Sequence, residues 1–415
     1  MANKSTTWRR RSLVELCEVH VDCVNRTAPV VDGPTPFKMI RTTNVRDGFI
    51  DTENVRYVTE PVYKKWTRRL VPKRGDVILT REAPLGGVGK VRTDDLIFLG
   101  QRLYHFRADP KKLDADFLLY ALMTDELQGQ IRGFGSGSTV EHMRLGDIPE
   151  LQIYAPDVSE QCRIGAMLSA YDELIENCQR RIRILESMAR ALYREWFVHF
   201  RFPGHEKYRR VASPLGDIHQ GWEVKKLGEL FKTVLGGTPS RKKPEFWEGG
   251  TIPWINSGKV NEPRITTPSE LITELALNRS AAKLMPKGTT VLAITGATLG
   301  QVSYLEIETT ANQSVVGITD PSGLYSEWIY LTVIDRIEGI VNHASGGAQQ
   351  HINKEVVNDV LLAPPPVSLA KEFKRLVAPM FQEVANLLFK VQNLSRTRDL
   401  LLPRLLSGKI EIGNN

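Results

Sequence analysis

Two long stretches of the chain carry an apolar residue at alternating steps of four and three positions. This pattern defines the a and d positions of a heptad, which is typical of helices that pack along a shared seam. The seam positions of the first stretch are Ile164, Leu168, Tyr171, Ile175, Cys178, Ile182, Leu185, Ala189, Leu192 and Trp196. Those of the second are Phe373, Val377, Met380, Val384, Leu387, Val391, Leu394, Arg398, Leu401 and Leu405. The pattern therefore predicts two long helices with matching seams, and these seam residues, except Cys178, Ala189 and Arg398, are expected at their interface.

The two seams are in register, because each position of the first plus 209 gives a position of the second (373 − 164 = 209). Nine of the ten positions in the second seam are apolar, and Arg398 is the exception. A polar seam residue can fix the register of packed helices at some cost in stability. Pro379 should start or kink the second helix near its N-terminal end, because proline removes a helical hydrogen bond.

The rest of each half has the short apolar runs and turn residues of a mixed α/β domain. Strands are predicted at 77–80, 103–106, 291–294 and 314–318, helices at 113–132 and 324–341, and loops at 86–87 and 133–137. The two halves correspond. Residues 8–16 resemble 222–230 at a shift of 214 (222 − 8), and His142 matches His351 at a shift of 209 (351 − 142). So long a period indicates a duplicated domain and suggests two related binding events at a fixed separation.

The expected fold class is thus α/β (mixed α+β), with two globular domains and two long helices. The expected boundaries are a domain at 1–157, a helix at 158–198, a linker at 199–221, a domain at 222–366, a helix at 367–407 and a tail at 408–415. Compact domains often have neighbouring termini. The end of the first helix should then lie near the start of the second, and the helices should form an antiparallel coiled coil. A helix from Ile164 to Trp196 is about 50 Å long at about 1.5 Å per residue.

The formal net charge of +7 is compatible with a polyanionic partner, although many basic proteins never bind nucleic acid. The chain shows no apolar run that could span a bilayer and no secretory signal, which favours the cytoplasm. Cys17, Cys23, Cys162 and Cys178 have no CxxC spacing, so neither a zinc site nor a disulfide framework is expected.

A search for catalytic motifs favours a chain without covalent chemistry. The glycine-rich stretch 86–91 lacks the first glycine and the final Ser or Thr of a phosphate loop, and 295–300 does not match a dinucleotide fingerprint. No paired metal-binding histidines, amino-methyltransferase loop or nuclease carboxylate cluster is evident. We therefore expect no cofactor and no metal on this chain.

What remains is a set of loops at corresponding places in the two halves, rich in side chains that hydrogen-bond bases and phosphates. The candidates in the first half are Lys38, Arg41, Thr42, Asn44, Arg81, Glu82, Lys90, Gln101, Arg102, Ser138, Thr139, His142 and Arg144. Those in the second are Asn256, Ser257, Lys259, Thr295, Thr298, Asn312, Gln313, Ser345, Gln349, Gln350 and His351. For any one of these loops taken alone, ordinary turn chemistry is the better explanation.

The chain resembles the specificity (S) subunit of a type I restriction-modification system. The likeness covers essentially the whole chain in the order domain, helix, domain, helix. The segments that carry it are 75–81, 192–197, 222–230, 236–240, 246–247, 252–255 and 401–410, with the Gly-Ser loops before His142 and His351.

The resemblance implies a non-catalytic subunit that binds double-stranded DNA. Each target-recognition domain would read one half of a split site, and the helices would set the gap and dock two methyltransferase subunits that use S-adenosylmethionine. Restriction-translocase subunits, which use ATP and Mg²⁺, would complete the complex. A spacer of about 50 Å can hold two readers about one DNA turn, about 34–36 Å, apart. The halves differ in their loops, so the target should be asymmetric.

Two other functions stay open from the sequence. A self-contained nuclease or methyltransferase is disfavoured by the missing motifs, and binding of S-adenosylmethionine to the isolated chain would revive it. A coiled-coil adaptor that binds other proteins with both domains would show no DNA sequence preference.

Overall fold

The computed structural model describes residues 8–135, 141–342 and 352–410. The chain forms two compact units. The first unit is Met1–Glu176 with Asn393–Asn415, and the second is Asn177–Gln392. In the described part of the chain, no helix combines the length and the apolar character that a membrane crossing requires.

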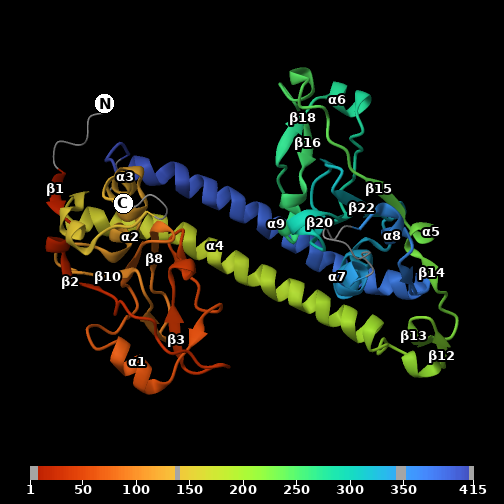
Figure 1. The fold of residues 1–415 in the computed structure, drawn as a ribbon, viewed down its shortest axis with the longest axis horizontal. Coiled ribbons are helices and arrows are strands. Elements are labelled where there is room, and N and C mark those ends of the chain that lie inside the picture. The colour runs from red at the N-terminus through yellow and green to blue at the C-terminus, as the bar shows by residue number, and fades with distance from the viewer. Residues whose placement is uncertain (1–7, 136–140, 343–351, 411–415) are drawn as a thin grey trace. The chain divides into compact units, whose positions relative to one another are not determined.

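The first unit combines small sheets with short helices (Figure 1). Its strands are β1 (Arg9–Ser12), β2 (Cys17–Asp22), β3 (Phe37–Ile40), β4 (Val45–Arg46), β5 (Phe49–Ile50), β6 (Arg56–Tyr57), β7 (Val77–Arg81), β8 (Leu85–Lys90), β9 (Leu96–Leu99), β10 (Leu103–Ala108) and β11 (Gln152–Ala155). Its helices are α1 (Glu60–Trp66), α2 (Ala115–Met123) and α3 (Asp125–Gly133), with 3-10 turns η1 (Val14–Leu16), η2 (Thr42–Asn44) and η3 (Leu145–Glu150). The strand orders are β2-β10-β7-β8, β6-β3-β9, β1-β11 and β4-β5.

The second unit has a closely similar set of elements. Its strands are β12 (Arg210–Ser213), β13 (Gly216–His219), β14 (Lys225–Lys226), β15 (Lys232–Leu235), β16 (Ile252–Ile255), β17 (Arg264–Ile265), β18 (Glu270–Ile272), β19 (Thr290–Ala293), β20 (Val302–Leu305), β21 (Thr310–Ala311), β22 (Val315–Thr319) and β23 (Leu361–Leu362). Its helices are α5 (Leu227–Leu230), α6 (Glu274–Arg279), α7 (Ser326–Asn342) and α8 (Lys354–Asn358), with 3-10 turns η5 (His205–Lys207), η6 (Pro244–Phe246), η7 (Ser257–Asn261) and η8 (Gly296–Thr298). The strand orders are β15-β22-β19-β20-β17, β18-β16-β21, β14-β23 and β12-β13.

The duplication expected from the sequence is present in the sheet topology. The order β2-β10-β7-β8 of the first unit matches β15-β22-β19-β20 of the second. In the smaller sheet, β3 runs parallel to β9 and antiparallel to β6, and β16 runs parallel to β21 and antiparallel to β18. The fold is therefore a mixed α+β domain used twice, as predicted.

Each domain is organised around one central strand that lies between two apolar cores. Along β7, Val77 and Leu79 pack in the core that includes α2, whereas Ile78 packs in a second core with residues of β3 and β9. Along β19, Leu292 belongs to the core that includes α7, whereas Val291 belongs to the core on the other side. Successive side chains of a strand point to opposite faces, so a continuous apolar run is what a strand buried on both faces requires.

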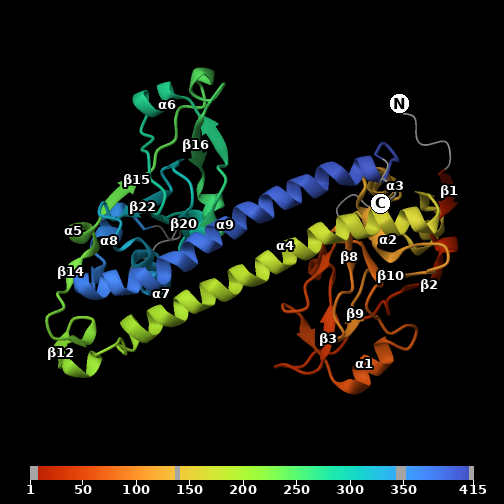
Figure 2. The ribbon, with the colours of Figure 1, turned by 180° about the vertical axis from the view of Figure 1, so that it is seen from behind.

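The two long helices are α4 (Val158–Tyr193), which continues as the π-helical turn η4 (Arg194–Val198), and α9 (Val367–Leu405). In the first unit, Leu168 and Leu402 share one core, and Asp172 pairs with Arg398. Residues farther along α4 are thus in contact with residues nearer the start of α9. The second unit shows the same direction (Figure 2), because Arg181 pairs with Glu383 at 2.6 Å and the Trp196 and Phe373 rings lie 5.8 Å apart. Within each unit the helix segments are antiparallel, as predicted.

The prediction of a loop at Gly86–Gly87 was wrong, because both glycines lie inside strand β8. The backbone around Gly48 crosses this strand at close range, with Gly48 N donating to Val88 O at 3.0 Å. A Cβ on Gly87 would lie 2.7 Å from Val45 O, and one on Gly89 would lie 2.5 Å from Phe49 O. These glycines therefore mark a close approach of two backbone segments rather than a turn.

Two other segments differ from the expected elements, and a third bears on the expectation for Pro379. The helix predicted at 113–132 is two helices, because Thr124 is extended and its side chain accepts a hydrogen bond from Leu127 N at the start of α3. Helix α9 begins at Val367, as the expected bounds have it, so Pro379 lies within the helix and does not start it. Phe373 and Val377, in the turns before the proline, are buried. The segment 199–221 contains the β12–β13 hairpin as well as turns.

Candidate nucleic-acid interface

Three backbone hydrogen bonds gather the candidate loops of the first unit at the end of β7. Gly100 N donates to Ile40 O at 2.8 Å, Arg81 N donates to Arg102 O at 2.8 Å, and Met143 N donates to Arg81 O at 2.9 Å. These bonds join segments that are far apart in the sequence. The loops that begin after β3, β7 and β9, and the segment at Met143, therefore form one cluster, called here the first loop cluster.

The second unit builds its loop cluster with equivalent bonds. Asn312 N donates to Ile255 O at 2.9 Å, Ile294 N donates to Ser314 O at 2.9 Å, and Ile352 N donates to Ile294 O at 2.9 Å. Each bond joins two elements that are equivalent to the two joined by its counterpart in the first unit. The scaffold of the two clusters is thus shared, and the side chains that it presents differ.

The most polar contact of the first loop cluster is the ion pair of Glu82 and Arg102. Arg102 Nε lies 3.0 Å from Glu82 Oε2, and the side chains are 44% and 25% exposed for Arg102 and Glu82. Gln101, next to Arg102, is exposed, and Thr42 donates its hydroxyl hydrogen to Ala83 O at 2.8 Å. His142 forms an antiparallel bridge with Glu82. The structure therefore brings Thr42, Glu82, Gln101, Arg102 and His142 together.

Other candidates of the first unit hold the loops rather than face outward. Asn44 is 3% exposed; its Oδ1 accepts from Arg41 N at 3.0 Å and its Nδ2 donates to Asn54 O at 2.9 Å. Arg81 is 4% exposed, and its guanidinium donates to Met143 O at 2.8 Å. A buried side chain that hydrogen-bonds the backbone of a loop stabilises the loop conformation, and it is poorly placed to touch a ligand directly.

Lys38 and Lys90 lie away from the first loop cluster. Lys38 Nζ is 2.6 Å from Asp95 Oδ2, which precedes β9, whereas Gln101 follows that strand. Lys90 is at the end of β8 that pairs with Val77, opposite Arg81, and it forms an ion pair with Asp116. Arg144 is exposed and precedes η3, next to Met143.

In the second loop cluster the candidates are mainly amides and hydroxyls. Asn256 is exposed and caps η7, accepting from Lys259 N at 3.1 Å. Lys259 Nζ donates to Glu262 at 2.7 Å and to Thr267 at 2.9 Å. Asn312 Oδ1 accepts from Ser314 N at 3.1 Å, and Gln313 is exposed.

The remaining candidates of the second unit lie in or beside these elements. Thr295 and Thr298 are half-buried around η8, with Thr298 Oγ1 donating to Thr295 O at 3.3 Å, and Ser257 begins η7. Outside the described residues lie Ser138, Thr139, Ser345, Gln349, Gln350 and His351.

The predicted seam residues are buried or half-buried in every case. Arg398, the polar exception, is 8% exposed, and the sequence did not indicate its partner, Asp172. Asp172 follows the seam position Tyr171, and the heptad pattern alone would place it beside the seam, where charged residues are common.

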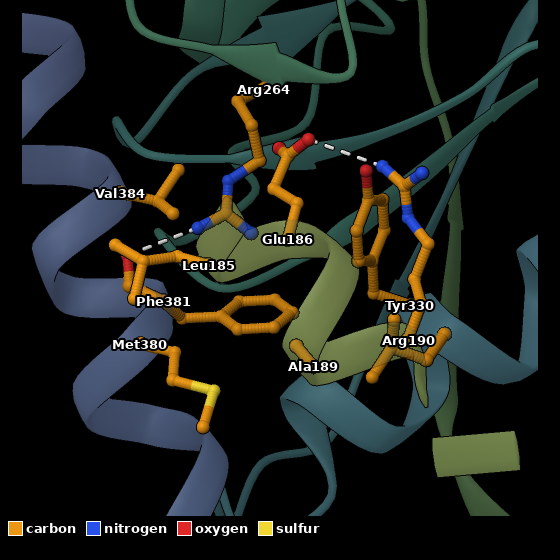
Figure 3. A pocket seen from close by; sticks show the side chains of 10 residues that line it. Leu185, Glu186, Ala189, Arg190, Arg264, Tyr330, Met380, Phe381 and Val384 are labelled. Carbon is orange, nitrogen blue, oxygen red and sulfur yellow. Dashed lines mark hydrogen bonds and ion pairs between the residues drawn. The ribbon is translucent and has the colours of Figure 1, made fainter. Parts of the chain in front are cut away.

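Arg264 is also buried; it joins the second domain to both long helices and was missed by the sequence analysis. Figure 3 shows its guanidinium directed toward α9, where Nη2 donates to Phe381 O at 3.1 Å, close to Ala189 and Glu186 of α4. The guanidinium lies 4.2 Å from the centre of the Phe381 ring and 4.7 Å from that of Tyr304. Its Nη2 is also 2.8 Å from Glu306 Oε1. Burial raises the pKa of Glu306, while Arg264 and Lys287 act against that rise.

Among the described residues, no group of three or more His, Cys, Asp or Glu side chains could hold a metal ion. The two loop clusters present donors and acceptors of hydrogen bonds instead. Such an arrangement is suited to recognition by contact with base edges and phosphates.

Comparison with known proteins shows which family has this architecture. The family model described as "Type I restriction modification DNA specificity domain" matches residues 7–186 and 219–371. The type I restriction enzyme MjaIX specificity subunit of Methanocaldococcus jannaschii is 27% identical over 86% of this chain and 82% of its own length. The HindI specificity subunit of Haemophilus influenzae is 22% identical over 81% of this chain and 87% of its own.

A crystal structure of the type I restriction-modification S subunit from M. genitalium has the same fold. The TM-score is 0.65 at 17% identity, with 98% of this chain and 97% of that chain covered. The first match covers the first globular domain and most of α4, and the second covers the second globular domain and the start of α9. The chain therefore belongs to the family of type I restriction-modification DNA specificity subunits.

Proposed function

We propose that this chain is the DNA sequence-recognition subunit of a type I restriction-modification complex and performs no catalysis itself. The observation that carries the proposal is the pair of loop clusters. Equivalent backbone bonds build both clusters, and both lie within the family match. A recognition domain used twice is the arrangement expected for a split DNA site.

The two half-sites should differ in sequence. The backbone hydrogen bond from Arg81 N to Arg102 O in the first unit is equivalent to the bond from Ile294 N to Ser314 O in the second. Arg102 and Ser314 therefore occupy equivalent places as acceptors, and so do Glu82 and Thr295, which follow the two donors. An arginine and a carboxylate hydrogen-bond different base edges from those that hydroxyls and amides contact. The target is therefore an asymmetric bipartite site.

The long helices supply the second part of the proposal. They fix the spacing of the two recognition domains and dock two methyltransferase subunits. In this complex S-adenosylmethionine belongs to the methyltransferase partners, and ATP and Mg²⁺ belong to restriction-translocase subunits. The chain itself binds double-stranded DNA and no cofactor, and it acts in the cytoplasm.

The test is base-modification sequencing of a host genome that expresses the methyltransferase partner, with and without this chain. A split motif with a methylated adenine in each half should appear only when the chain is present. Exchange of residues 8–156 for the corresponding segment of another specificity subunit should change one half of the motif and leave the other intact.

A stable complex with the methyltransferase that yields no motif would contradict the proposal. That result would favour a coiled-coil adaptor, which binds proteins and shows no DNA sequence preference. Binding of S-adenosylmethionine to the isolated chain would instead favour an enzyme.

A further inference from the structure

Arg102 has a backbone conformation that few residues other than glycine adopt. Its φ is +66°, in the left-handed region, where a side chain is disfavoured unless surrounding contacts hold it. Those contacts are present. The Arg102 carbonyl accepts from Arg81 N at 2.8 Å, and the next residue, Leu103, pairs with Thr80 in the sheet. The core of the domain thus fixes the point from which this side chain leaves the backbone.

The side chain itself is held by one carboxylate and remains accessible. Glu82 contacts the guanidinium at Nε, and 44% of the Arg102 side chain is exposed. Glu82 is restrained in turn, because it pairs with His142 across an isolated bridge. Among the described residues, Glu82 is the acidic side chain within ion-pair distance of Arg102. An arginine held in this way loses little conformational freedom when it binds a partner.

Guanine is the base that matches an arginine best. Its O6 and N7 atoms form a pair of acceptors in the major groove, and two guanidinium N–H groups can donate to them together. Local backbone strain persists at functional sites, where the surrounding structure over-determines it. A strained, carboxylate-held and partly exposed arginine in a DNA-recognition loop therefore has the properties of a specificity determinant.

The second domain lacks this pair at the equivalent place. Ser314 accepts the backbone bond that Arg102 accepts in the first domain, and Thr295 follows the donor as Glu82 does. The neighbouring side chains are Asn312 and Gln313, whose amides match adenine rather than guanine. The difference is in the side chains and not in the scaffold.

We propose that Arg102 specifies a guanine in the half-site bound by the first recognition domain, and that Glu82 is the residue that positions it. This inference rests on the proposed function, since it assigns a base to one of the two loop clusters.

The experiment uses the full chain in complex with its methyltransferase partner. Arg102→Asn removes the guanidinium with a residue that tolerates the left-handed conformation. Arg102→Lys keeps the charge and removes the paired donors, and Glu82→Gln keeps the size and removes the negative charge. Arg74→Asn is the matched control. Arg74 also pairs with a carboxylate, Asp94 at 2.9 Å, but it precedes the opposite end of β7.

Base-modification sequencing should show a guanine at one fixed position of the half-motif that exchange of residues 8–156 alters. Arg102→Asn and Arg102→Lys should relax that position alone, with a loss of discrimination of roughly 5- to 150-fold, the factor that corresponds to one base-specific pair of hydrogen bonds. Glu82→Gln should relax the same position by a smaller factor. Arg74→Asn should leave the motif unchanged.

A half-motif without guanine, or one that Arg102→Asn and Arg102→Lys leave intact, would overturn the inference while the proposed function stands. Absence of any motif with the wild-type chain would overturn the proposed function itself. If Arg102→Asn abolishes methylation at all sites, the base preference of the variant complex is measured by its gel-shift binding to four duplexes that differ at this base pair. Equal binding to all four supports the inference, and a retained preference for guanine refutes it.

Discussion

Asp172 Oδ1 lies 2.6 Å from Arg398 Nη1 in the interior of the first unit, where the Asp172 side chain is fully buried. The other carboxylate oxygen of Asp172 accepts from Tyr120 OH at 2.7 Å and from Arg92 Nη2 at 3.1 Å. One aspartate on α4 thus connects α9 with two elements of the first domain. Burial and the neighbouring Asp172 carboxylate raise the pKa of Tyr120, so this hydroxyl stays protonated as a donor.

The second unit uses different chemistry at the equivalent junction. Phe381 on α9 corresponds to Asp172 at the helix shift of 209, and Glu306 corresponds to Arg92 at the domain shift of 214 (306 − 92). Here the cation comes from Arg264, which binds the Phe381 carbonyl and Glu306. Each domain is therefore attached to the helices by a buried charge network, but the charged residues stand at different positions in the two units.

Removing the Asp172 carboxylate should strongly destabilise the first unit. Asp172→Ala leaves Arg398 and Arg92 partly buried without their shared partner, and breaking a buried ion pair costs about 3–5 kcal/mol. Thermal or urea unfolding of the full chain, followed by circular dichroism, measures the change. Arg181→Ala is the matched control on the same helix. Its pair with Glu383 is exposed and should contribute less than about 1 kcal/mol. Equal losses for the two variants would contradict this assignment.

Arg264→Met should destabilise the second unit by a similar amount, about 3–5 kcal/mol at neutral pH, because Glu306 loses its nearest cation in a buried site. Glu306 then has a still higher pKa when folded than when unfolded. The folded state with a protonated Glu306 is favoured below the unfolded pKa of about 4.5, and this advantage is lost as the pH rises through the folded pKa.

The penalty of Arg264→Met should therefore shrink as the pH is lowered from 7 toward 5, and Glu306→Gln in the same chain should relieve part of it. Unfolding titrations at several pH values test both statements. Lys226→Met removes an exposed ion pair of the same unit, with Asp359 at 2.7 Å, and should show neither effect. A pH-independent penalty for Arg264→Met would show that lost packing, and not the uncompensated charge, causes the loss.

Acid should weaken the first domain through Asp76. Burial by itself raises the pKa of Asp76, but hydrogen bonds from Arg107 and His105 outweigh that effect and lower it to about 2. A carboxylate with a depressed folded pKa contributes stability above its unfolded pKa, about 3.8, and loses it as the pH falls toward 2. The contribution is about 2.5 kcal/mol, at about 1.4 kcal/mol for each pKa unit.

Asp76→Asn should consequently reduce stability at pH 7 and flatten its dependence on pH between about 5 and 2. Urea unfolding measured by tryptophan fluorescence and circular dichroism at each pH gives the slope. An unchanged slope in Asp76→Asn would place the acid-sensitive group elsewhere.

The glycines of β8 should not tolerate a side chain. Gly89→Ala places a methyl group against the Phe49 carbonyl, where backbone would have to move, and the overpacking should cost about 1–3 kcal/mol. Gly129→Ala is the control, because its Cβ meets no atom within 4 Å inside helix α3. Alanine is the better helix former, so Gly129→Ala should raise stability by up to about 1 kcal/mol. Thermal unfolding of the two variants should shift in opposite directions.

The sequence by itself determined the long helices, the duplication and the main strands. The reason is that these features are periodic: a seam repeats every seven residues, and a duplicated scaffold repeats its buried strands at one shift. The positions of β7, β10, β19 and β22 follow from short apolar runs that are buried on both faces. The same periodicity identified Arg398 as an exception to the seam.

Only the tertiary structure decided which polar groups meet. Arg398 hydrogen-bonds Asp172, which is 226 residues away in the sequence, and Arg264 hydrogen-bonds the carbonyl of Phe381, which is 117 residues away. The loops at Arg81 and Met143 are joined by a backbone bond that no side-chain pattern records. Hydrophobic periodicity states which face of an element is buried, but a hydrogen bond depends on the positions of two atoms, and these positions exist only after the chain has folded.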